Sequence, residues 1–296
     1  MTKPLFSRMT VIGVGLMGGS LSLASKKRGL VGEVIGFEPC AAQLMIAERL
    51  GVIDRSEPEL PKSVEGSDLV VLAAPVGVFE SALKEIGPCA PPGCVITDIG
   101  SVKGDLVLRL ERLTPPGVFF VGAHPIAGKE KSGVEEASSE LFSGARCILT
   151  PTPKTDLRAL ERLREFWEAL GSNVLEMEPD LHDRMLAAVS HLPHLLAYAL
   201  MEALSCAPLA AEGLLGLSGG GLRDFTRIAA SSPEMWRDIA LLNAREILSA
   251  LTAYETVLKQ VHRMIADQDG AGLLSLFERA KAARERLADS FPAKTS

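Results

Sequence analysis

Gly13-Val14-Gly15-Leu16-Met17-Gly18 is the stretch of sequence that decides the fold of the front half of the chain. It follows an apolar run, Thr10–Val14, that predicts a buried strand, and it opens a helical segment, Gly18–Arg28. Glycines with this spacing permit a tight turn and let the backbone approach a pyrophosphate at the N-terminus of the helix. The stretch therefore predicts the first strand, turn and helix of a dinucleotide-binding domain.

Glu38 adds a second nucleotide-binding signal, because it ends the next predicted strand, Glu33–Phe37, twenty residues beyond Gly18. An acidic side chain in that place accepts hydrogen bonds from the ribose hydroxyls of adenosine. None of the residues 39–42 carries a cation for a 2′-phosphate, which favours NAD over NADP. A tight turn without a ligand and a flavin in place of nicotinamide remain as alternatives.

Strands and helices alternate over the first part of the chain. Further short apolar runs predict strands, and helical stretches such as Ala41–Leu50 and Asp156–Leu170 separate them. This alternation is typical of crossover connections and of a mostly parallel sheet. We expect an α/β Rossmann-type domain over residues 1–178. Its later strands are Leu69–Ala73, Val95–Asp98, Phe119–Gly122, Cys147–Thr150 and Asn173–Met177.

The pattern changes after Pro179, where apolar residues recur at helical spacing from Leu181 to Leu204 and again from Pro233 to Ala266. No strand of comparable strength is predicted there. Helices with so much apolar surface must bury it against one another or against a second subunit. From Lys259 onward the charge-rich sequence is expected to form a solvated helix pair. Residues 179–296 are thus predicted to be an all-α domain.

The composition argues against several classes of function. The 296 residues are 47% hydrophobic and 23% charged, as in an ordinary globular enzyme, and the net charge of −6 disfavours general binding to nucleic acid or to a membrane surface. The sequence has no leader pattern and no apolar run of the ~18–20 residues that a membrane span needs. Five scattered cysteines without a CxxC pair predict free thiols and a cytoplasmic location. No set of histidines and carboxylates has metal-ligand spacing, so no metal is expected.

Two segments at predicted strand ends should face the cofactor, because ligands bind outside the carboxyl ends of parallel strands. They are Ala73-Ala74-Pro75 and Asp98-Ile99-Gly100-Ser101-Val102-Lys103. Ser101 is equally placed to cap a helix over Val102–Leu113, and both roles are compatible. The expected cofactor site comprises Gly13, Gly15, Leu16, Met17, Gly18, Glu38, Ala74, Pro75 and Ser101.

His124 is the strongest catalytic candidate of the five histidines. It lies in Gly122-Ala123-His124-Pro125-Ile126-Ala127-Gly128, just past a predicted strand end on the cofactor edge. An imidazole held there by small residues and a proline is suited to act as a general base.

Two clusters in the helical half are chemically unusual. Ser190-His191-Leu192-Pro193-His194 lies in an apolar helix that Pro193 should kink, and the alternative to a functional role is that neighbouring backbone satisfies both histidines. Gly219-Gly220-Gly221-Leu222-Arg223-Asp224-Phe225-Thr226-Arg227 offers two guanidinium groups, which can each bind a carboxylate through two parallel hydrogen bonds. One arginine is equally suited to pair with an acidic neighbour such as Asp183 or Asp224.

Together these segments resemble the prephenate dehydrogenases, a family that includes the arogenate and cyclohexadienyl dehydrogenases of tyrosine biosynthesis. The matching segments run in order along most of the chain and are specific in combination. They are residues 13–20 (GVGLMGGS), 98–103 (DIGSVK), 122–133 (GAHPIAGKEKSG), 190–194 (SHLPH), 224–228 (DFTRI) and 233–238 (PEMWRD).

The resemblance implies an NAD-dependent oxidative decarboxylation of prephenate to 4-hydroxyphenylpyruvate. By this likeness His124 accepts the proton of the ring hydroxyl, and Ser101 helps to orient it. Arg227 binds a substrate carboxylate and His194 contacts the substrate side chain. Glu130 and Lys131 lie at the pocket mouth, and Trp236 closes the pocket. The helical domain would bind substrate and form a homodimer, and feedback inhibition by tyrosine would act at the active site.

The sequence departs from the family pattern at two positions. Glu38 stands where an aspartate is expected, and Lys129 is bulkier than the small polar residue expected before Glu130. Arogenate, or both compounds, remains the alternative substrate, although His194 favours prephenate. Two other functions remain as alternatives. A β-hydroxyacid dehydrogenase would need a catalytic lysine in the helical domain, and a non-catalytic NAD-sensing regulator would bind the cofactor without turnover.

Overall fold

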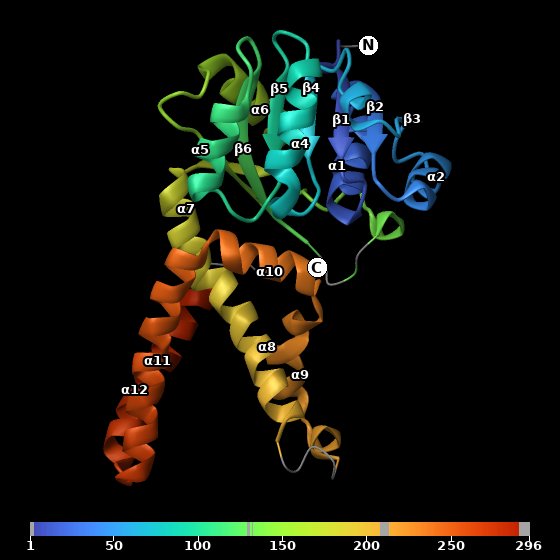
Figure 1. The fold of residues 1–296 in the computed structure, drawn as a ribbon. Helices are drawn as coiled ribbons and strands as arrows, with labels where there is room; N and C mark the ends of the chain where they lie inside the picture. The colour runs from blue at the N-terminus through green and yellow to red at the C-terminus, as the bar shows by residue number, and fades with distance from the viewer. Residues whose placement is uncertain (1–2, 129–130, 132, 208–212, 290–296) are drawn as a thin grey trace. The chain divides into compact units, whose positions relative to one another are not determined.

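The structure is a computed structural model that describes residues 3–128, 131, 133–207 and 213–289 (Figure 1). The chain divides into two units, residues 1–247 and residues 248–296. The first unit holds the sheet and most of the helices. The domain boundary that the sequence predicts at residue 178 lies inside this first unit and stays a prediction.

An eight-stranded sheet forms the centre of the first unit, in the order β3-β2-β1-β4-β5-β6-β7-β8. The strands from β3 to β6 are parallel, as the alternation of strands and helices predicts. The order reverses between β1 and β4, which is where open sheets of this kind bind ligands. The strands are β1 Phe6–Ile12, β2 Val31–Phe37, β3 Arg55–Ser56, β4 Leu69–Leu72, β5 Val95–Asp98, β6 Phe119–Ile126, β7 Arg146–Thr150 and β8 Asn173–Glu176.

β6 is longer than the sequence predicts, and this changes the position of the catalytic candidate. It pairs in parallel with β5 only up to Val121 and then continues antiparallel to β7 as far as Ile126. His124 therefore lies inside a strand, opposite Ile148, and not past a strand end. Pro125 fits there because the segment beyond Val121 has no ladder on its β5 side that would need a backbone N–H. β7 and β8 are parallel to each other and antiparallel to the rest.

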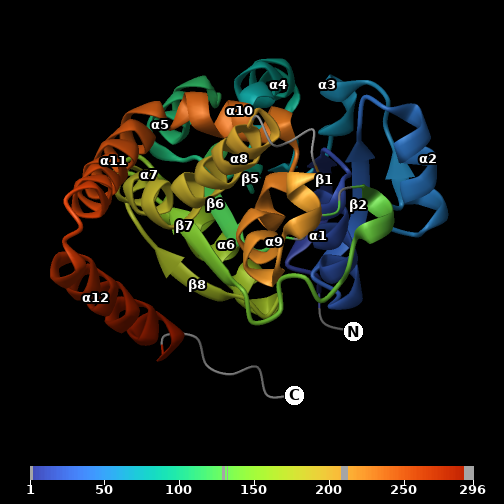
Figure 2. The same cartoon turned by 90° about the horizontal axis from the view of Figure 1, so that it is seen from below.

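Helices cover both faces of the sheet, and each face has its own apolar core (Figure 2). On one side Trp167 packs edge-on against Phe142 and Phe166, and such pairs contribute about 0.5–1.5 kcal/mol each beyond the area they bury. The helices on this face are α1 Leu16–Lys27, α2 Ala41–Arg49 and α6 Leu157–Ala169. Those on the other are α3 Leu60–Ser63, α4 Phe79–Ile86 and α5 Gly104–Leu113.

The helices that follow the sheet domain are more broken than the apolar periodicity predicts. The expected helix 181–204 consists of α7, a π-helical turn at Ala187–His191, and α8. Pro193 lies in the first turn of α8, where its missing N–H leaves the preceding turn without a regular donor, so the predicted kink takes the form of this π turn. The helices are α7 Pro179–Leu186, α8 Leu192–Ser205, α9 Gly220–Thr226 and α10 Pro233–Leu242.

The expected helix 233–266 is also divided, because Asn243 leaves the helical path between α10 and α11 (Ala244–Ala266). Its side chain is buried and donates hydrogen bonds to the carbonyl of Asp183 and to His191. A short polar side chain that binds neighbouring groups in this way competes with regular helix formation. Apolar spacing does not reveal such a break.

The second unit contains the remainder of α11 and the helix α12 (Gly270–Asp289), as predicted for a helix pair. Many of its apolar side chains are exposed, among them Leu258, Ile265 and Phe277. Neither of the two cores includes a described residue of this unit. Within the described part of the chain, no helix combines the length and apolar character that a membrane crossing requires.

Candidate active site

The glycine turn after β1 combines two crowded glycines with one open one. Gly13 has a φ of +99°, and a Cβ atom there would lie 2.6 Å from the backbone nitrogen of Ala74. A Cβ atom on Gly18 would collide with the carbonyl of Gly13. Gly15, by contrast, has no atom within 4 Å of its Cβ position. The outer glycines thus serve packing, whereas Gly15 leaves room for a group to approach the N-terminus of α1.

This turn fits the pyrophosphate of a dinucleotide. The first turn of α1 contains no acidic side chain, and its N-cap residue, Gly15, has no side-chain cap, so its backbone N–H groups are available to an anion. Glu38 follows β2 directly and is half-buried. Leu16 is buried and Met17 half-buried. The residues expected to hold NAD therefore gather at the carboxyl ends of β1 and β2, beside the point where the strand order reverses.

Ala74, Pro75 and Ser101 complete this edge from the ends of β4 and β5. Ala74 is half-buried and Pro75 exposed, and the close approach of Gly13 brings them next to the glycine turn. Ser101 is half-buried. Helix α5 begins at Gly104 with Lys103 as its N-cap residue, so the alternative in which Ser101 caps this helix is wrong. The helix starts two residues later than the sequence predicts.

A fully buried ion pair fixes the segment that carries Ser101. Lys103 donates from Nζ to Asp98, to the carbonyl of Gly100 at 2.7 Å and to that of Val102 at 3.2 Å, which uses all three ammonium protons. Asp98 also accepts a hydrogen bond from the backbone of Gly100 at 2.8 Å. Burial raises the pKa of Asp98, while Lys103 acts in the opposite direction. The pair ties the loop to the end of β5.

His124 heads a chain of three buried side chains. Its Nδ1 lies 2.8 Å from Nε2 of His182, and Nδ1 of His182 lies 2.8 Å from Oδ1 of Asp183. Oδ1 of Asp183 also accepts a hydrogen bond from the backbone N–H of Lys103, again at 2.8 Å. His124 is 8% exposed and His182 not at all. These hydrogen bonds therefore connect His124, which is only slightly accessible to solvent, to the N-terminus of α5.

Burial favours the neutral form of these histidines. Burial, reinforced by the neighbouring His182 and Lys103, holds the pKa of His124 well below its usual value of 6.5. Burial also lowers the pKa of His182, although Asp183 opposes this effect. Burial lowers the pKa of His191 to about 4. A neutral imidazole at position 124 has a free lone pair and can accept a proton.

His194 and Trp236 form a second group beside this chain. Their rings stack with centroids 3.9 Å apart and an interplanar angle of 21°. Nδ1 of His194 donates to the carbonyl of Ser190 at 2.8 Å. For this histidine, neighbouring backbone thus satisfies one ring nitrogen, which is the alternative to a functional role that the sequence left open. The other ring nitrogen, Nε2, is left to other partners. Nδ1 of His191 is bound by the side chain of Asn243 at 3.1 Å. The indole Nε1 of Trp236 is buried and has no hydrogen-bond partner among the described residues.

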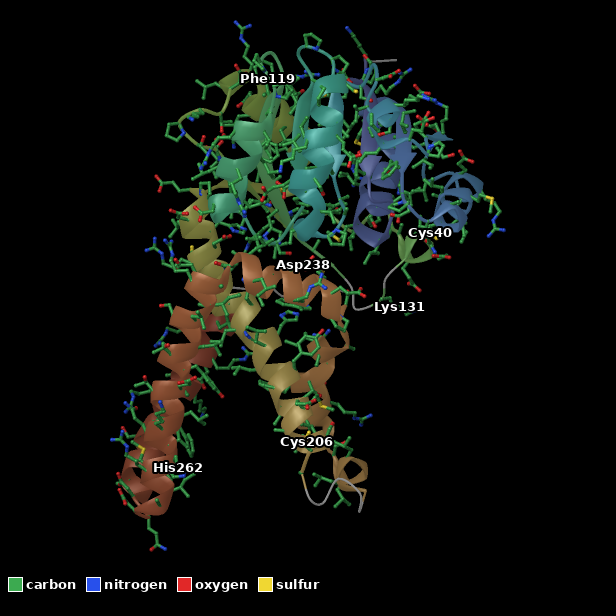
Figure 3. All side chains as sticks on the ribbon, viewed as in Figure 1. Cys40, Phe119, Lys131, Cys206, Asp238 and His262 are labelled. Atoms are coloured by element: carbon green, nitrogen blue, oxygen red, sulfur yellow. The ribbon has the colours of Figure 1, made fainter. Side chains whose placement is uncertain are left out.

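The remaining expected site residues lie at the surface or outside the described residues. Arg227 is exposed at the end of α9. Lys131 projects from the surface and pairs with Glu136 at 3.0 Å (Figure 3). Glu130, like Lys129, lies outside the described residues. Asp183, which the sequence offered as a possible arginine partner, binds His182 and the backbone of Lys103.

Sequence reasoning missed His182, Asp183 and Asn243. His182 and Asp183 are adjacent in the first two turns of α7, but this helix also carries Asp180 and Arg184, so their polar character did not distinguish them. Only the fold brings them to His124, 58 positions away in the sequence.

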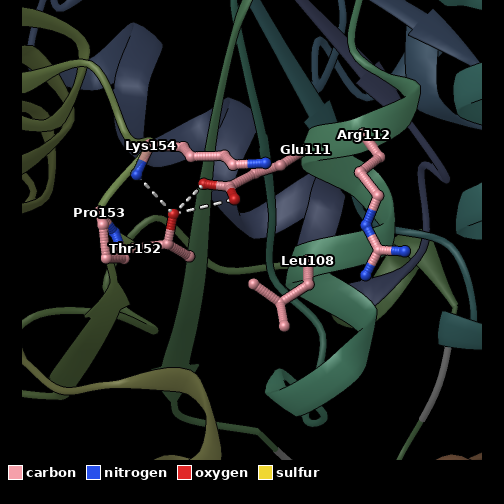
Figure 4. A pocket seen from close by; sticks show the side chains of 6 residues that line it. All are labelled: Leu108, Glu111, Arg112, Thr152, Pro153 and Lys154. Atoms are coloured by element: carbon pink, nitrogen blue, oxygen red, sulfur yellow. Dashed lines mark hydrogen bonds between the residues drawn. The ribbon is translucent and has the colours of Figure 1, made fainter.

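A surface pocket lies apart from these groups (Figure 4). It is lined by Leu108, Glu111, Arg112, Thr152, Pro153 and Lys154. The Thr152 hydroxyl donates to Glu111 at 2.7 Å and accepts from the backbone of Lys154 at 3.0 Å. These polar atoms satisfy one another and hold the loop after β7 against α5, so we assign the pocket no chemistry. No cluster of three or more possible metal ligands occurs among the described residues.

Comparisons with known proteins agree along almost the whole chain. Residues 21–176 match the family "Prephenate dehydrogenase, nucleotide-binding domain", and residues 178–279 match "Prephenate dehydrogenase, dimerization domain". The prephenate dehydrogenase of Bacillus subtilis is 36% identical over 93% of this chain and 74% of its own length. The cyclohexadienyl dehydrogenase of Zymomonas mobilis is 33% identical over 95% of this chain and 96% of its own.

A solved structure matches equally well. It is prephenate dehydrogenase from Aquifex aeolicus in complex with hydroxyphenyl propionate and NAD+, with a TM-score of 0.89 and 37% identity. The match covers 95% of this chain and 98% of that one. The fold comparison and the sequence comparisons thus point to the same family.

Proposed function

The chain belongs to the prephenate dehydrogenase family, and from this membership we propose that it converts prephenate to 4-hydroxyphenylpyruvate by NAD-dependent oxidative decarboxylation. The observation that carries the proposal is the burial of His124 at the cofactor edge of the sheet, which holds the pKa of its imidazole well below the usual value. NAD, when bound, supplies the hydride acceptor. The ring carboxylate leaves as CO2, and the ring becomes aromatic.

His124 is proposed to act as the general base. Its neutral imidazole accepts the proton of the ring hydroxyl, and its low pKa keeps it in the accepting form at neutral pH. Because aromaticity develops during the reaction, the protein has little to do beyond aligning the substrate and removing one proton. Ser101 is proposed to orient the hydroxyl and the imidazole from the loop that Lys103 anchors.

The cofactor site proposed for NAD combines the glycine turn with the ends of β2, β4 and β5. The open space at Gly15 receives the pyrophosphate, and Glu38 accepts hydrogen bonds from the adenosine ribose. No basic residue occurs between positions 39 and 42, which supports NAD over NADP. The Aquifex aeolicus relative has NAD+ bound, which supports the same choice.

Substrate binding is proposed for residues of the helical segment and the loop after β6. Arg227 would bind a substrate carboxylate, and His194 would contact the side chain through Nε2. Trp236, whose buried indole N–H has no partner among the described residues, would close the pocket above His194. Glu130 and Lys131 would lie at its mouth. Arogenate, or dual specificity, remains the alternative, since one relative is a cyclohexadienyl dehydrogenase.

The proposed assembly is a homodimer formed through the helical domain. The match to a family dimerization domain and the exposed apolar side chains of the second unit support it. Inhibition by tyrosine is proposed to act at the active site, because the product resembles tyrosine in its ring. A cytoplasmic location fits the free cysteines, which include the exposed Cys40 and Cys206 (Figure 3).

A spectrophotometric assay tests the reaction. The purified chain is mixed with prephenate or arogenate and with NAD or NADP, while NADH or NADPH formation and the aromatic product are followed. We expect prephenate with NAD to give the highest kcat/KM. A preference for arogenate would select the alternative substrate. Binding of NAD without turnover of either compound would reject the enzymatic function in favour of a regulator.

Substitution of Arg227 tests the proposed carboxylate site. Arg227→Ala should raise the KM for prephenate by roughly tenfold to hundredfold, because a hydrogen-bonded charge pair contributes about 1.5–3 kcal/mol. The affinity for NAD should stay unchanged. Arg245→Ala is the matched control, since Arg245 is exposed and pairs with its neighbour Glu246. Equal losses of prephenate and NAD affinity would reject this role for Arg227.

A further inference from the structure

The hydrogen-bond chain behind His124 has a fixed direction. It begins at the backbone N–H of Lys103, which can only donate, and this N–H points at Oδ1 of Asp183. Oδ1 of the ionised carboxylate can only accept, so the second group at 2.8 Å, Nδ1 of His182, carries a proton. The neutral His182 then has a bare Nε2, which accepts from Nδ1 of His124. Nε2 of His124 is left unprotonated.

We propose that Asp183 and His182 are positioning residues that hold His124 in the tautomer with the proton on Nδ1, so that its Nε2 is the base of the proposed reaction. This inference rests on the proposed function. The proton of the substrate hydroxyl moves to Nε2 of His124 as the O–H bond breaks and an N–H bond forms. The resulting imidazolium donates through Nδ1 to His182, and the carboxylate of Asp183 compensates its charge from the far end of the chain.

The surroundings of Asp183 support a charged carboxylate. It sits at the N-terminus of α5, where the helix dipole favours an anion. Its second oxygen lies against Gly104, where a Cβ atom would be 2.6 Å away, so only glycine leaves it room. Asn243 holds the backbone of the same residue by donating to its carbonyl at 2.9 Å. Asp183 is thus fixed from three sides.

The other ionisable groups near His124 and His182 influence the pKa values of these two histidines but are not part of the hydrogen-bond chain. Asp98 ends β5, Lys103 lies in the loop after it and His191 lies on the π turn, and each of them shifts the pKa of His124 or of His182. Cys147 on β7 contacts the backbone of His124, and burial raises the pKa of its thiol, so it stays neutral. None of these groups bonds to Nδ1 of His124, which is occupied by His182.

The hydrogen-bond chain predicts losses of different size for two substitutions of Asp183. Asp183→Asn keeps an oxygen acceptor, and the Lys103 N–H should orient that oxygen toward itself and His182. The tautomer then survives while the charge is lost. Asp183→Leu removes the acceptor and releases His182. We expect kcat to fall roughly tenfold in the first variant and hundredfold or more in the second, within the range for a misplaced base. NAD affinity should not change in either.

The pH profile of kcat/KM and the tautomer of His124 are two measurements that would not change if Asp183 had a purely structural role. In Asp183→Asn the acidic limb of kcat/KM should shift to lower pH, because the protonated His124 loses a compensating charge. Asp180→Asn, an exposed residue of the same helix, is the charge-matched control and should leave kcat and the pH profile unchanged. Nitrogen NMR of histidine-labelled protein should report a proton on Nδ1 of His124 in the wild type.

Each outcome decides the proposal. A wild-type His124 with its proton on Nε2 would overturn it, as would wild-type kcat and an unshifted pH profile in Asp183→Asn. If Asp183→Leu does not fold, the asparagine variant and the tautomer still decide. If the wild type does not oxidise prephenate or arogenate, the proposed function fails, and the tautomer measurement alone judges the hydrogen-bond chain.

Discussion

At the scale of single residues, burial gives His124 its proposed chemistry. The ring is almost wholly removed from water and lies near the ammonium group of Lys103, and both effects disfavour the imidazolium form. A base with a depressed pKa is weaker than a free imidazole but is fully deprotonated at neutral pH. Because the proposed reaction gains an aromatic ring, a weak base that is always in the accepting form suffices.

Substitution of this residue gives the first prediction. His124→Asn should lower kcat by about 10²–10⁴-fold, the usual loss when a general base is removed, while NAD affinity stays the same. His262→Asn is the control, because His262 is exposed on α11. Steady-state kinetics and NAD titration measure both. Near-normal turnover of His124→Asn would contradict the assignment of the base.

The pH dependence of the wild type follows from the same pKa shift. The pKa of His124 in the folded chain lies well below 6.5, and the reaction needs the neutral ring. The kcat/KM for prephenate should therefore stay level from neutral pH down through 6.5 and decline only at more acidic pH, as the ring is protonated. A decline centred at pH 6.5 would show that the imidazole titrates as an exposed histidine does.

At the scale of elements, the glycine turn shows how far local sequence predicts structure. The order strand, helix, strand of β1, α1 and β2 followed from glycine spacing and apolar runs, because these features depend on residues close in the sequence, although β1 begins four residues and ends two residues earlier than predicted. The course of β6 through Pro125 did not, since it depends on pairing with β7. The two helix breaks differ in this respect. Pro193 predicts the first break from the local sequence, whereas the break at Asn243 is explained only by the hydrogen bonds of its side chain to Asp183 and His191.

The candidate site divides in the same way. The sequence identified His124, His194 and Trp236, which lie in characteristic motifs, and the structure stacks the last two on each other. It did not identify His182, because nothing in the local sequence distinguishes a histidine that supports another side chain from one that packs in a core. Long-range hydrogen bonds are properties of the fold, so no pattern along the chain reveals them.

Two of the three glycines of the turn, Gly13 and Gly15, give a prediction at this scale. Gly13→Ala combines a φ of +99° with a collision at Ala74, so it should destabilise the fold by more than about 2 kcal/mol. Gly15→Ala meets open space at a φ of −85° and should cost at most about 1 kcal/mol. Thermal unfolding and NAD titration separate the two. Gly15→Ala should lose at least roughly tenfold in NAD affinity, because its methyl group occupies the space meant for the pyrophosphate.

The reverse pattern would contradict the division of roles. If Gly15→Ala unfolds at a much lower temperature than the wild type, or binds NAD as well as the wild type does, the open space at Gly15 is not the pyrophosphate site. If Gly13→Ala is as stable as the wild type, the inference that Gly13 is needed for the close packing of the turn against the end of β4 is wrong.

At the scale of the whole molecule, the two units differ in how they bury apolar surface. The first has a core on each face of its sheet. The second contributes no described residue to either core, although α11 carries apolar residues at alternating intervals of three and four. These are Leu251, Tyr254, Leu258, Val261 and Ile265. Such spacing forms one continuous stripe, which is the seam by which helices associate.

A second copy of the chain is the expected cover for this stripe, and a charge placed in it tests the idea. Leu258 is 54% exposed, so each copy would bury about half a leucine side chain, and a twofold interface would bring two introduced carboxylates into one apolar seam. Leu258→Glu should therefore turn a dimer into a monomer in light scattering after gel filtration. Gln260→Glu adds the same charge to the same helix outside the stripe and should remain dimeric. NAD affinity should be unchanged in both, because the glycine turn belongs to the first unit. A wild-type chain that runs as a monomer, or a Leu258→Glu variant that stays dimeric, would remove this stripe from the interface.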